Sequence, residues 1–443
     1  MKRIVCLLVL TMFVYVAEAQ VIKRLADRTK QKLENKASEK INEGIDKATD
    51  KPKKKENSKT KKTGSDAEEE EKATQDEEKA AESDEAAEKT TTKTPTLSSY
   101  SKFDFVPGEK IVAFGNFERD EIGDFPVNWN TNASGEVVTL NNKEGKWFQI
   151  NKEGVFHPEF IKQIPDNFTL EFDLGVNNDF DYYSSELSMA IGYLDEERQF
   201  TALDFHPDFG PHEGVRLTLH PFSPSMKAGR STFYNSLKGN RRIDNNVLIE
   251  TWNPKTSNFI HVALWRQNQR LRVYVNQEKI FDLPKAFDMN SKYNSVVFSS
   301  NGMHKKEDYY VINNIRLAAG APDTRNKLIT EGKFVTRGIL FDVNSDVIKP
   351  ESYGVLKDIG KVLTENPDVK ITIVGHTDTD GEDAKNLDLS KRRANAVKTA
   401  LQNEFKISGE RMQTDGKGET QPVDKNDSPE AKANNRRVEF IKS

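Results

Sequence analysis

Residues 375–394 decide the fold of the last part of the chain, and they read GHTDTDGEDAKNLDLSKRRA. A short apolar run, residues 369–374, leads into this stretch, and residues 390–405 carry apolar side chains at helical spacing. An apolar run that ends in a polar turn and is followed by an amphipathic helix is typical of an α/β domain. The stretch therefore predicts a strand, a turn and a helix.

The flanking sequence extends this pattern in both directions. Before it lie an apolar run, residues 334–341, and a helical stretch, residues 350–364, with Leu356, Ile359 and Leu363 on one face. After it, residues 437–441 read as a last strand, which could pair antiparallel in a mixed sheet. Residues 331–443 are thus predicted to form an α/β domain of the order strand, helix, strand, helix, strand (βαβαβ).

Five short motifs in this domain carry a family resemblance. They are FDVNS at 341–345, GHTD at 375–378 with Gly381, Asn386 with LSKRRA at 389–394, GKGE at 416–419 with Pro422, and NRRV at 435–438. In this order and spacing they resemble the OmpA carboxyl-terminal family, which includes peptidoglycan-associated lipoproteins and the wall-binding part of flagellar stator proteins. The resemblance covers residues 331–443.

The resemblance implies non-covalent binding of peptidoglycan through the diaminopimelate of its stem peptide. In that family an aspartate of the GHTD motif and an arginine of the Ser-x-x-Arg-Ala motif hold the ligand's ammonium and carboxylate groups. The matching residues here are Asp378 and Arg393. Asn386 and Arg436 match positions that line the same groove, and Asp342 lies in a loop that borders it.

The chemistry of such a site also follows from the residues. The free end of diaminopimelate is a zwitterion, so a selective site needs one anion and one cation, and a planar guanidinium can hold a carboxylate by two hydrogen bonds. Asp378 and Arg393 meet that need. If Ser390 caps the second helix, residues 391–393 place three cations in its first turn, where the helix dipole disfavours them. That placement predicts an anion-binding helix end. His376 is expected to be structural.

Residues 99–321 have the composition of an all-β domain. Short runs rich in β-branched and aromatic residues, such as 168–172, 213–220 and 259–265, alternate with Gly, Asn, Asp and Pro, and no helical pattern separates them. We expect a β-sandwich of the jelly-roll type. Residues 260–265, 271–276 and 280–281 resemble successive strands of concanavalin-like or laminin-G-like domains.

The amino-terminal 98 residues are predicted to contribute no packed domain. Residues 1–19 have a basic start, an apolar stretch and an Ala-Glu-Ala end, which is typical of a cleaved secretory signal that takes the single cysteine, Cys6, with it. Residues 20–50 carry a weak apolar stripe, read as a helix-prone start of a linker, a short coiled coil or a membrane-surface helix. Residues 51–98 contain a lysine block and an acidic block with almost no apolar residue, so we expect a disordered linker.

Several other sites are considered and set aside. The loop of Asp204, His206, Asp208, His212 and Glu213 lacks a recognised metal spacing, and the run 177–181 offers oxygens that Asx-rich loops carry without calcium. A glycosidase of this fold would need a third acid after Glu171 and Asp173, where the sequence has Leu-Gly-Val instead. We predict no catalytic residues, no metal and no cofactor.

The sequence as a whole indicates a structural tether. A formal net charge of -4 gives no reason to expect nucleic acid as a partner. We expect an exported protein of the periplasm, associated with the outer membrane and cell wall, whose carboxyl-terminal domain holds diaminopimelate-type peptidoglycan. The sandwich would face the outer membrane, a glycan or a partner protein. The alternative is a carbohydrate-binding or adhesive sandwich that the carboxyl-terminal domain anchors to the wall.

Overall fold

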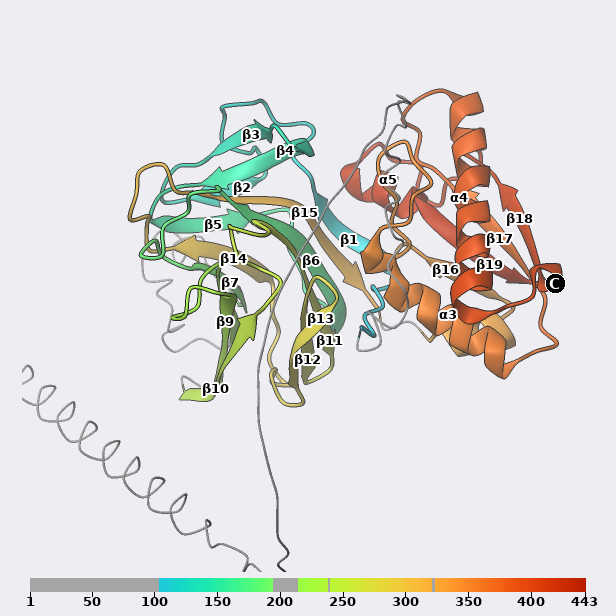
Figure 1. Ribbon diagram of the computed structural model, residues 1–443, viewed down its shortest axis with the longest axis horizontal. Coiled ribbons are helices and arrows are strands. Elements are labelled where there is room, and N and C mark those ends of the chain that lie inside the picture. Colours follow the sequence, from blue (N-terminus) through green and yellow to red (C-terminus); the bar gives the residue numbers. More distant parts are fainter. Residues whose placement is uncertain (1–102, 194–213, 238–239, 321–322) are drawn as a thin grey trace, which may run out of the picture. The chain divides into compact units, whose positions relative to one another are not determined.

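Two antiparallel sheets build the first part of the chain that the structure describes (Figure 1). This computed structural model describes residues 103–193, 214–237, 240–320 and 323–443. The predicted signal, helix-prone segment and linker lie outside the described residues, and so does the loop from Asp204 to Glu213. No helix in the described ranges has the length and apolar character needed to span a membrane.

The larger sheet has eight strands and the smaller one seven. The larger runs in the order β13-β12-β11-β6-β15-β4-β3, with β1 also paired to β15, and the smaller in the order β10-β9-β8-β7-β14-β5-β2. The larger sheet consists of β1 (Lys110–Gly115), β3 (Glu136–Leu140), β4 (Lys143–Ile150), β6 (Asn167–Val176), β11 (Phe259–Gln267), β12 (Arg270–Val275), β13 (Glu278–Leu283) and β15 (Tyr310–Ala319). The smaller consists of β2 (Trp129–Thr131), β5 (Gly154–Pro158), β7 (Leu187–Gly192), β8 (Gly214–His220), β9 (Gly229–Leu237), β10 (Asn240–Ile249) and β14 (Ser295–Ser300).

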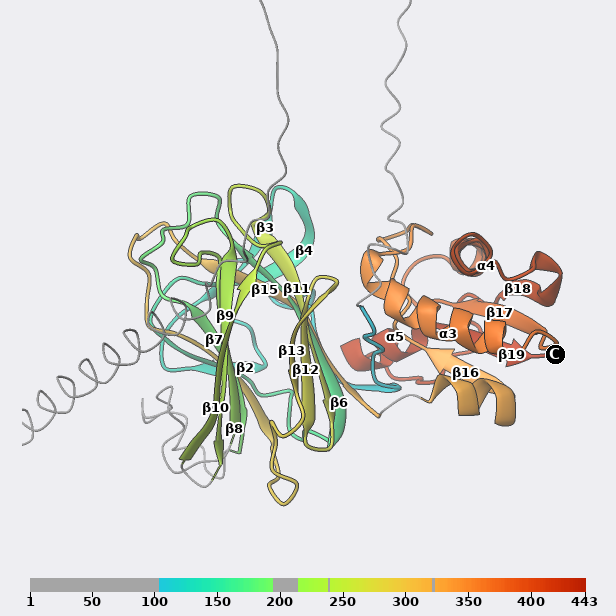
Figure 2. The ribbon, with the colours of Figure 1, turned by 60° about the horizontal axis from the view of Figure 1, so that its bottom comes forward.

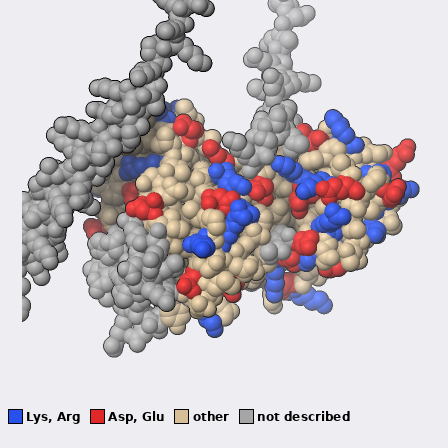
Figure 3. Space-filling model, turned by 90° about the horizontal axis from the view of Figure 1, so that it is seen from below, with Lys and Arg blue, Asp and Glu red and all other residues tan. Residues whose placement is uncertain are grey.

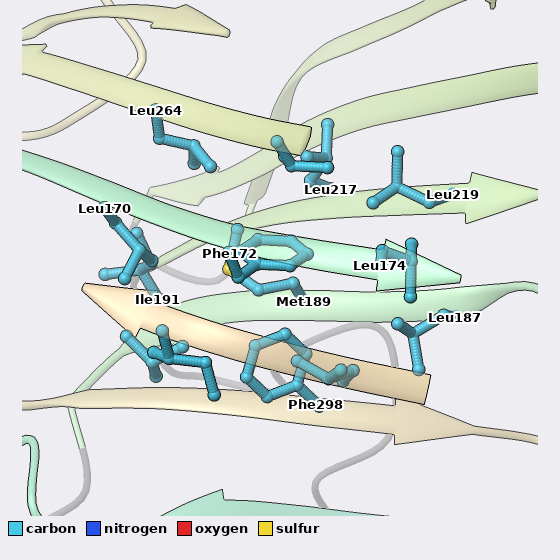
Figure 4. Packing of buried hydrophobic residues seen from close by; sticks show 14 of the residues in the cluster. Leu170, Phe172, Leu174, Leu187, Met189, Ile191, Leu217, Leu219, Leu264 and Phe298 are labelled. Carbon is cyan, nitrogen blue, oxygen red and sulfur yellow. The ribbon is translucent and has the colours of Figure 1, made fainter. Parts of the chain in front are cut away.

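The two sheets enclose one apolar core. Alternate residues of each strand point into it, as Leu170, Phe172 and Leu174 do from β6 and Leu187 and Met189 from β7 (Figure 4). A fully buried Leu or Phe side chain contributes about 1.5–3 kcal/mol relative to an exposed one, so this core is the main source of the domain's stability. The residues between Leu170, Phe172 and Leu174 on β6, which are Glu171 and Asp173, point to the opposite face of the larger sheet.

The all-β prediction is confirmed for the described part of this region. The run 168–172 falls in β6, the described residues 214–220 of the second run form β8, and the run 259–265 falls in β11. Of the three runs that resemble concanavalin-like strands, 260–265 falls in β11, 271–275 in β12 and 280–281 in β13, while Asn276 follows β12. The jelly-roll order of connections and the boundaries 99 and 321 stay predictions.

The carboxyl-terminal domain is a four-stranded sheet with helices. Its sheet order is β16-β19-β17-β18, with β19 antiparallel to both neighbours and β17 parallel to β18. The elements are η2 (Asn326–Thr330), β16 (Lys333–Thr336), η3 (Pro350–Ser352), α3 (Tyr353–Glu365), β17 (Ile371–His376), α4 (Asp383–Phe405), η4 (Gly409–Arg411), β18 (Met412–Gly416), α5 (Pro429–Asn435) and β19 (Arg437–Lys442). The mixed sheet is therefore confirmed.

The predicted order βαβαβ is incomplete, because β18 and α5 were missed. In β18 only Met412 and Gly416 are buried, so this edge strand has no alternating apolar pattern to detect. Helix α5 spans seven residues, which is too short for a helical period. The first strand is also shorter than the predicted run 334–341, since β16 ends at Thr336.

Helices α3 and α4 lie on one face of this sheet (Figure 2). Val355, Ile359 and Leu363 of α3 and Val397 and Leu401 of α4 are buried in one cluster with the sheet. The apolar side chains recur every three to four residues, so the helices present one apolar stripe each. This packing fixes the loop that follows β17 against the first half of α4.

The described residues belong to one compact unit, and the segment before β1 joins its two parts. Phe103 and Phe105 are buried in the same cluster as α3, together with Tyr274 of the larger sheet. A Cβ atom on Gly354 would lie 2.1 Å from the carbonyl oxygen of Phe105, so the helix needs glycine where the segment crosses it. Asn434 holds both the N–H (3.1 Å) and the carbonyl (2.9 Å) of Ile111.

Candidate functional site

The turn after β17 presents Asp378 beside Arg436. The Thr377 N–H donates to the Gly418 carbonyl at 3.0 Å, which ties the turn to the loop after β18. The Asp378 carboxylate forms an ion pair with the guanidinium of Arg436, and their side chains are 12% and 39% exposed. Arg436 follows α5 directly and also lies over the Phe114 ring, 5.7 Å from its centroid. Asp378, the anion of the predicted clamp, is thus paired with the Arg436 cation in the absence of a ligand.

Arg393 reaches the same place from α4. Its guanidinium donates to the Ser345 carbonyl at 2.9 Å and to the Asp342 carbonyl at 3.4 Å, and lies 4.9 Å from the centroid of the Phe341 ring. Burial lowers the pKa of Arg393 to about 10, and the nearby Asp378 carboxylate acts in the opposite direction. A guanidinium has five N–H donors, so Arg393 keeps donors for a carboxylate ligand beyond the two that these bonds occupy.

Asn386 holds the turn in place. Its amide donates to the Glu419 carboxylate at 2.6 Å and to the Asp380 carbonyl at 3.0 Å, and the side chain is buried. Asn386 therefore positions the turn that carries Asp378. Asp342 is exposed and takes part through its carbonyl, which accepts from Arg393.

All five predicted residues line one cavity of ≈ 430 Å³. Pockets of about 300–1,000 Å³ suit small-molecule ligands, so this cavity has room for more than one amino-acid end. Thr377 also lines it and is buried, yet its Oγ1 atom has no hydrogen-bond partner in the part of the chain that the structure describes. An unsatisfied buried hydroxyl is a place where a ligand or water can bind.

Ser390 is not a helix cap, which corrects the sequence argument. Helix α4 begins at Asp383, seven residues earlier, with an acid in its first turn. Ser390 lies inside the helix, where its hydroxyl accepts from the Gly418 N–H at 2.9 Å and donates to the Leu387 carbonyl at 2.9 Å. The helix begins earlier than predicted because Ala384 and Lys385, which follow Glu382 closely, favour the helix interior. The three cations at 391–393 therefore lie mid-helix, and the inference of an anion-binding helix end is withdrawn.

His376 is buried at the end of β17, 3.6 Å from the carboxylate of Glu439 on β19. Burial would raise the pKa of Glu439, but hydrogen bonds from His376 and Lys333 and the charge of Arg437 outweigh it and hold the pKa well below its usual range. This cluster joins strands of the sheet beneath the cavity, so it gives His376 a structural setting.

The larger sheet supplies cavity residues that sequence reasoning did not assign to a site. They are Glu171 and Asp173 of β6, His261 of β11, and Asn314 and Arg316 of β15. The antiparallel register places His261 opposite Asp173, and Arg316 opposite Glu171. The alternation of Glu171 and Asp173 was visible in the sequence, but their partners lie about 90 and 140 residues away and become neighbours only through the strand order.

Hydrogen bonds and ion pairs join these five side chains in one network. Arg316 donates to both oxygens of Glu171, at 3.1 Å and 2.6 Å. His261 lies between the acids, with Nδ1 2.7 Å from Asp173 and Nε2 3.4 Å from Glu171. The Asn314 amide donates to the other Asp173 oxygen at 2.7 Å. Both oxygens of Glu171 are thus occupied, which leaves this acid poorly placed for the glycosidase role set aside above.

The charge state of the network follows from these contacts. Burial alone would lower the pKa of His261, but its hydrogen bonds to Asp173 and Glu171 outweigh that effect and raise the pKa to about 10. Burial alone would raise the pKa of Asp173, but His261 and Asn314 lower it. At pH 7 the histidine is therefore a cation between two carboxylates.

No metal site emerges from the described residues. They contain no group of three His, Cys, Asp or Glu side chains placed to hold a metal ion. In the run 177–181, the Asp181 carboxylate is paired with Lys305 at 3.1 Å, and Asn177 donates to Asp308 at 3.3 Å.

On the face that Figure 3 shows, basic and acidic side chains lie interspersed, without a large patch of one sign.

Comparison with known proteins identifies the carboxyl-terminal domain. Residues 340–436 match the model of the OmpA family. The chain is 42% identical over 101 residues to outer membrane porin F of Pseudomonas aeruginosa, covering 23% of this chain and 29% of the porin. It is 33% identical over 130 residues to the probable lipoprotein YiaD of Escherichia coli, covering 27% and 59%. It is 31% identical over 145 residues to the peptidoglycan-binding protein ArfA of Mycobacterium tuberculosis, covering 30% and 43%.

The carboxyl-terminal domain is therefore OmpA-like, as the motifs indicated. The chain spans less than two thirds of the length of each of these relatives.

Proposed function

We propose that this protein binds peptidoglycan non-covalently and tethers the outer envelope or a partner to the cell wall. The ligand would be the zwitterionic end of diaminopimelate in the stem peptide. The observation that carries the proposal is the meeting of Asp378, Arg393 and Arg436 in one cavity of an OmpA-like domain. One relative of this domain bears the name peptidoglycan-binding protein.

The roles of the three charges follow from their partners. Asp378 would accept the ligand's ammonium group, and Arg393 would hold the carboxylate with the donors that the Ser345 and Asp342 carbonyls leave free. Arg436 pairs with Asp378 without ligand, so it keeps the anion compensated and turned toward the cavity. Asn386 would act through the turn that it holds.

Binding at a single site of this kind is expected to be weak. Arg436 is 39% exposed, so water competes for its contacts and salt screens its charge. The wall repeats the same stem peptide many times, so rebinding and any oligomerisation would raise the effective affinity without new contacts. Such binding is reversible and suits a tether better than a catalyst. The proposed location is the periplasm, at the outer membrane and cell wall.

Co-sedimentation of the whole chain with diaminopimelate-type peptidoglycan tests this proposal. Asp378→Ala and Arg393→Gln should each reduce the bound fraction at least about tenfold, since each removes one charge-assisted contact. Arg392→Gln is the matched control: Arg392 is the neighbouring arginine, but its side chain points to Asp388 and Asp346 on the surface. Full retention by the Asp378 and Arg393 variants, with the melting temperature unchanged, would refute the clamp.

A second candidate function is glycan binding by the sandwich. Tyr183 is 75% exposed, and its ring lies 5.2 Å from that of Tyr182 and 5.5 Å from that of His304, measured between centroids. The three rings form a small aromatic cluster, and an aromatic face can pack against the C–H groups of a sugar. Loss of soluble glycan binding in Tyr183→Ala, with peptidoglycan binding retained, would support this function; equal glycan binding by both proteins would remove it.

A further inference from the structure

The cavity of the proposed clamp has a second wall, made by the sandwich. The clamp residues come from the loop after β17, from α4 and from the residue after α5, whereas Asp173, His261 and Asn314 come from the larger sheet. The Lys349 charge from the carboxyl-terminal domain also lowers the pKa of Asp173, so the two walls influence each other electrostatically. A ligand in this cavity would meet both.

The charges around the cavity suit a ligand with groups of both signs. Seven acids line it, together with six Lys or Arg residues and the protonated His261. A pocket for a simple anion or cation would carry an excess of one sign. The balance instead favours a ligand that carries ammonium, carboxylate and amide groups, as a stem peptide does.

Asp173 is the group on the sandwich wall that can still accept hydrogen bonds. Its carboxylate has about four acceptor positions, of which His261 and Asn314 use two. Its side chain is 28% exposed, whereas that of Glu171 is 2% exposed. Arg316 and Glu171 occupy each other, and the Nδ1 atom of His261 and the amide of Asn314 are turned to Asp173, so these neighbours orient the Asp173 carboxylate.

Stability alone gives no reason for this network. Replacing a buried ion pair by apolar residues of similar size is often neutral or stabilising, because the desolvation cost of the charges is large. A carboxylate that is held by two neighbours and left partly exposed toward a ligand cavity is instead typical of a preorganised acceptor.

We infer that Asp173 of the sandwich is a specificity-determining residue, which accepts an amide N–H of the stem peptide attached to the zwitterionic end held by Asp378 and Arg393. This inference rests on the proposed function. It predicts that the whole chain prefers the diaminopimelate-containing tripeptide to free diaminopimelate, since the free amino acid cannot reach the second wall with an amide.

The test compares these two soluble ligands by titration with the whole chain and its Asp173→Asn variant. In the variant, the side-chain oxygen of the new asparagine should keep the hydrogen bond from the His261 N–H. Its NH₂ group should then take the place of the Asp173 oxygen beside Asn314. The ligand's amide N–H would therefore meet a donor in place of an acceptor. Tripeptide affinity should fall at least about tenfold, while affinity for free diaminopimelate should change less than about twofold. Asp282→Asn is the control, because Asp282 lies on the same sheet outside the cavity lining and pairs with Arg270.

Equal affinities of Asp173→Asn and wild type for the tripeptide would overturn the inference, and so would equal losses for both ligands. If Asp173→Asn lowers the melting temperature, Asn314→Gly repeats the comparison, because glycine accepts the φ of 53° at residue 314 and only the orienting amide is lost. In contrast, a wild-type chain that binds neither ligand, or an Asp378→Ala variant that binds both normally, would refute the proposed function itself.

Discussion

The carboxyl-terminal clamp and the sandwich network are both clusters of opposite charges, yet they differ in how they meet water. In the clamp, Arg436 is 39% exposed and Arg393 keeps free donors. In the network, Arg316 and Glu171 are 9% and 2% exposed and occupy each other. The difference in exposure supports the proposal that the clamp exchanges partners when a ligand binds, and the inference that the network holds the Asp173 carboxylate in place.

The largest expected effect comes from breaking the buried pair of the network. Arg316→Met leaves Glu171 buried with His261 as its only cation, and removing one partner of a buried pair costs about 3–5 kcal/mol. The free energy of unfolding, measured with denaturant, should fall by about that amount. Arg270→Met, which breaks the exposed pair with Asp282, should cost less than about 1 kcal/mol. Equal costs would contradict the contrast between sealed and exposed pairs.

A pH titration of stability sharpens the same comparison. The folded chain keeps the His261 proton up to a pKa of about 10, whereas the unfolded chain releases it near 6.5. The stabilisation is therefore complete below pH 6.5 and is lost as the pH rises toward 10. The stability gap between wild type and His261→Gln should narrow by up to about 1.4 kcal/mol per unit between pH 7 and 9.

A stability gap between wild type and His261→Gln that stays constant between pH 7 and 9 would show that His261 is not held protonated by the two acids.

A smaller effect tests how the two parts are joined. Ala is more favourable than Gly inside a helix by about 1 kcal/mol, so Gly354→Ala would stabilise α3 if nothing crossed it. The carbonyl of Phe105 lies 2.1 Å from the position of the new Cβ atom, so the variant should instead lose about 1–3 kcal/mol through overpacking. A raised melting temperature would contradict the contact between this segment and α3.

The smallest effect is expected at the surface of α4. Arg392 pairs with Asp388 and Asp346, all at least two fifths exposed, and such pairs contribute about 0.3–0.5 kcal/mol. Arg392→Gln should change the free energy of unfolding by no more than that, measured at low salt. A loss of more than about 1 kcal/mol would mean that exposed pairs in this protein are not weak, and the contrast between clamp and network would lose its basis.

The sequence could indicate which residues meet at the proposed clamp, because these residues lie within local motifs. Asp378, Asn386 and Arg393 fall within sixteen residues of one strand-turn-helix unit, and a family resemblance carried their spacing. The helix start was placed wrongly at Ser390 because a serine before a basic run looks like a cap. Ser390 packs closely against Gly375 and Gly416: a Cβ atom there would lie 2.2 Å from its carbonyl oxygen and 2.4 Å from its Oγ atom, respectively. This packing is visible only in three dimensions.

The second wall could not be predicted in the same way. His261 and Arg316 meet Asp173 and Glu171 through the order β11-β6-β15, and strand order depends on long-range pairing that a local pattern does not contain. The β runs themselves were found, since alternation of apolar residues needs no knowledge of the neighbouring strand. The strands could therefore be predicted from local sequence, whereas the network between them could not.

The most direct test of the proposed zwitterion clamp compares two types of peptidoglycan with the same protein. The whole chain is sedimented with diaminopimelate-type peptidoglycan and, in parallel, with a type that has lysine at the same position, whose side chain ends in an ammonium group without the carboxylate. If Asp378 and Arg393 together hold a zwitterion, the chain should sediment with the first polymer and bind the second at least about tenfold more weakly, because Arg393 loses its partner. Equal binding to both polymers, or binding to neither, would contradict the clamp.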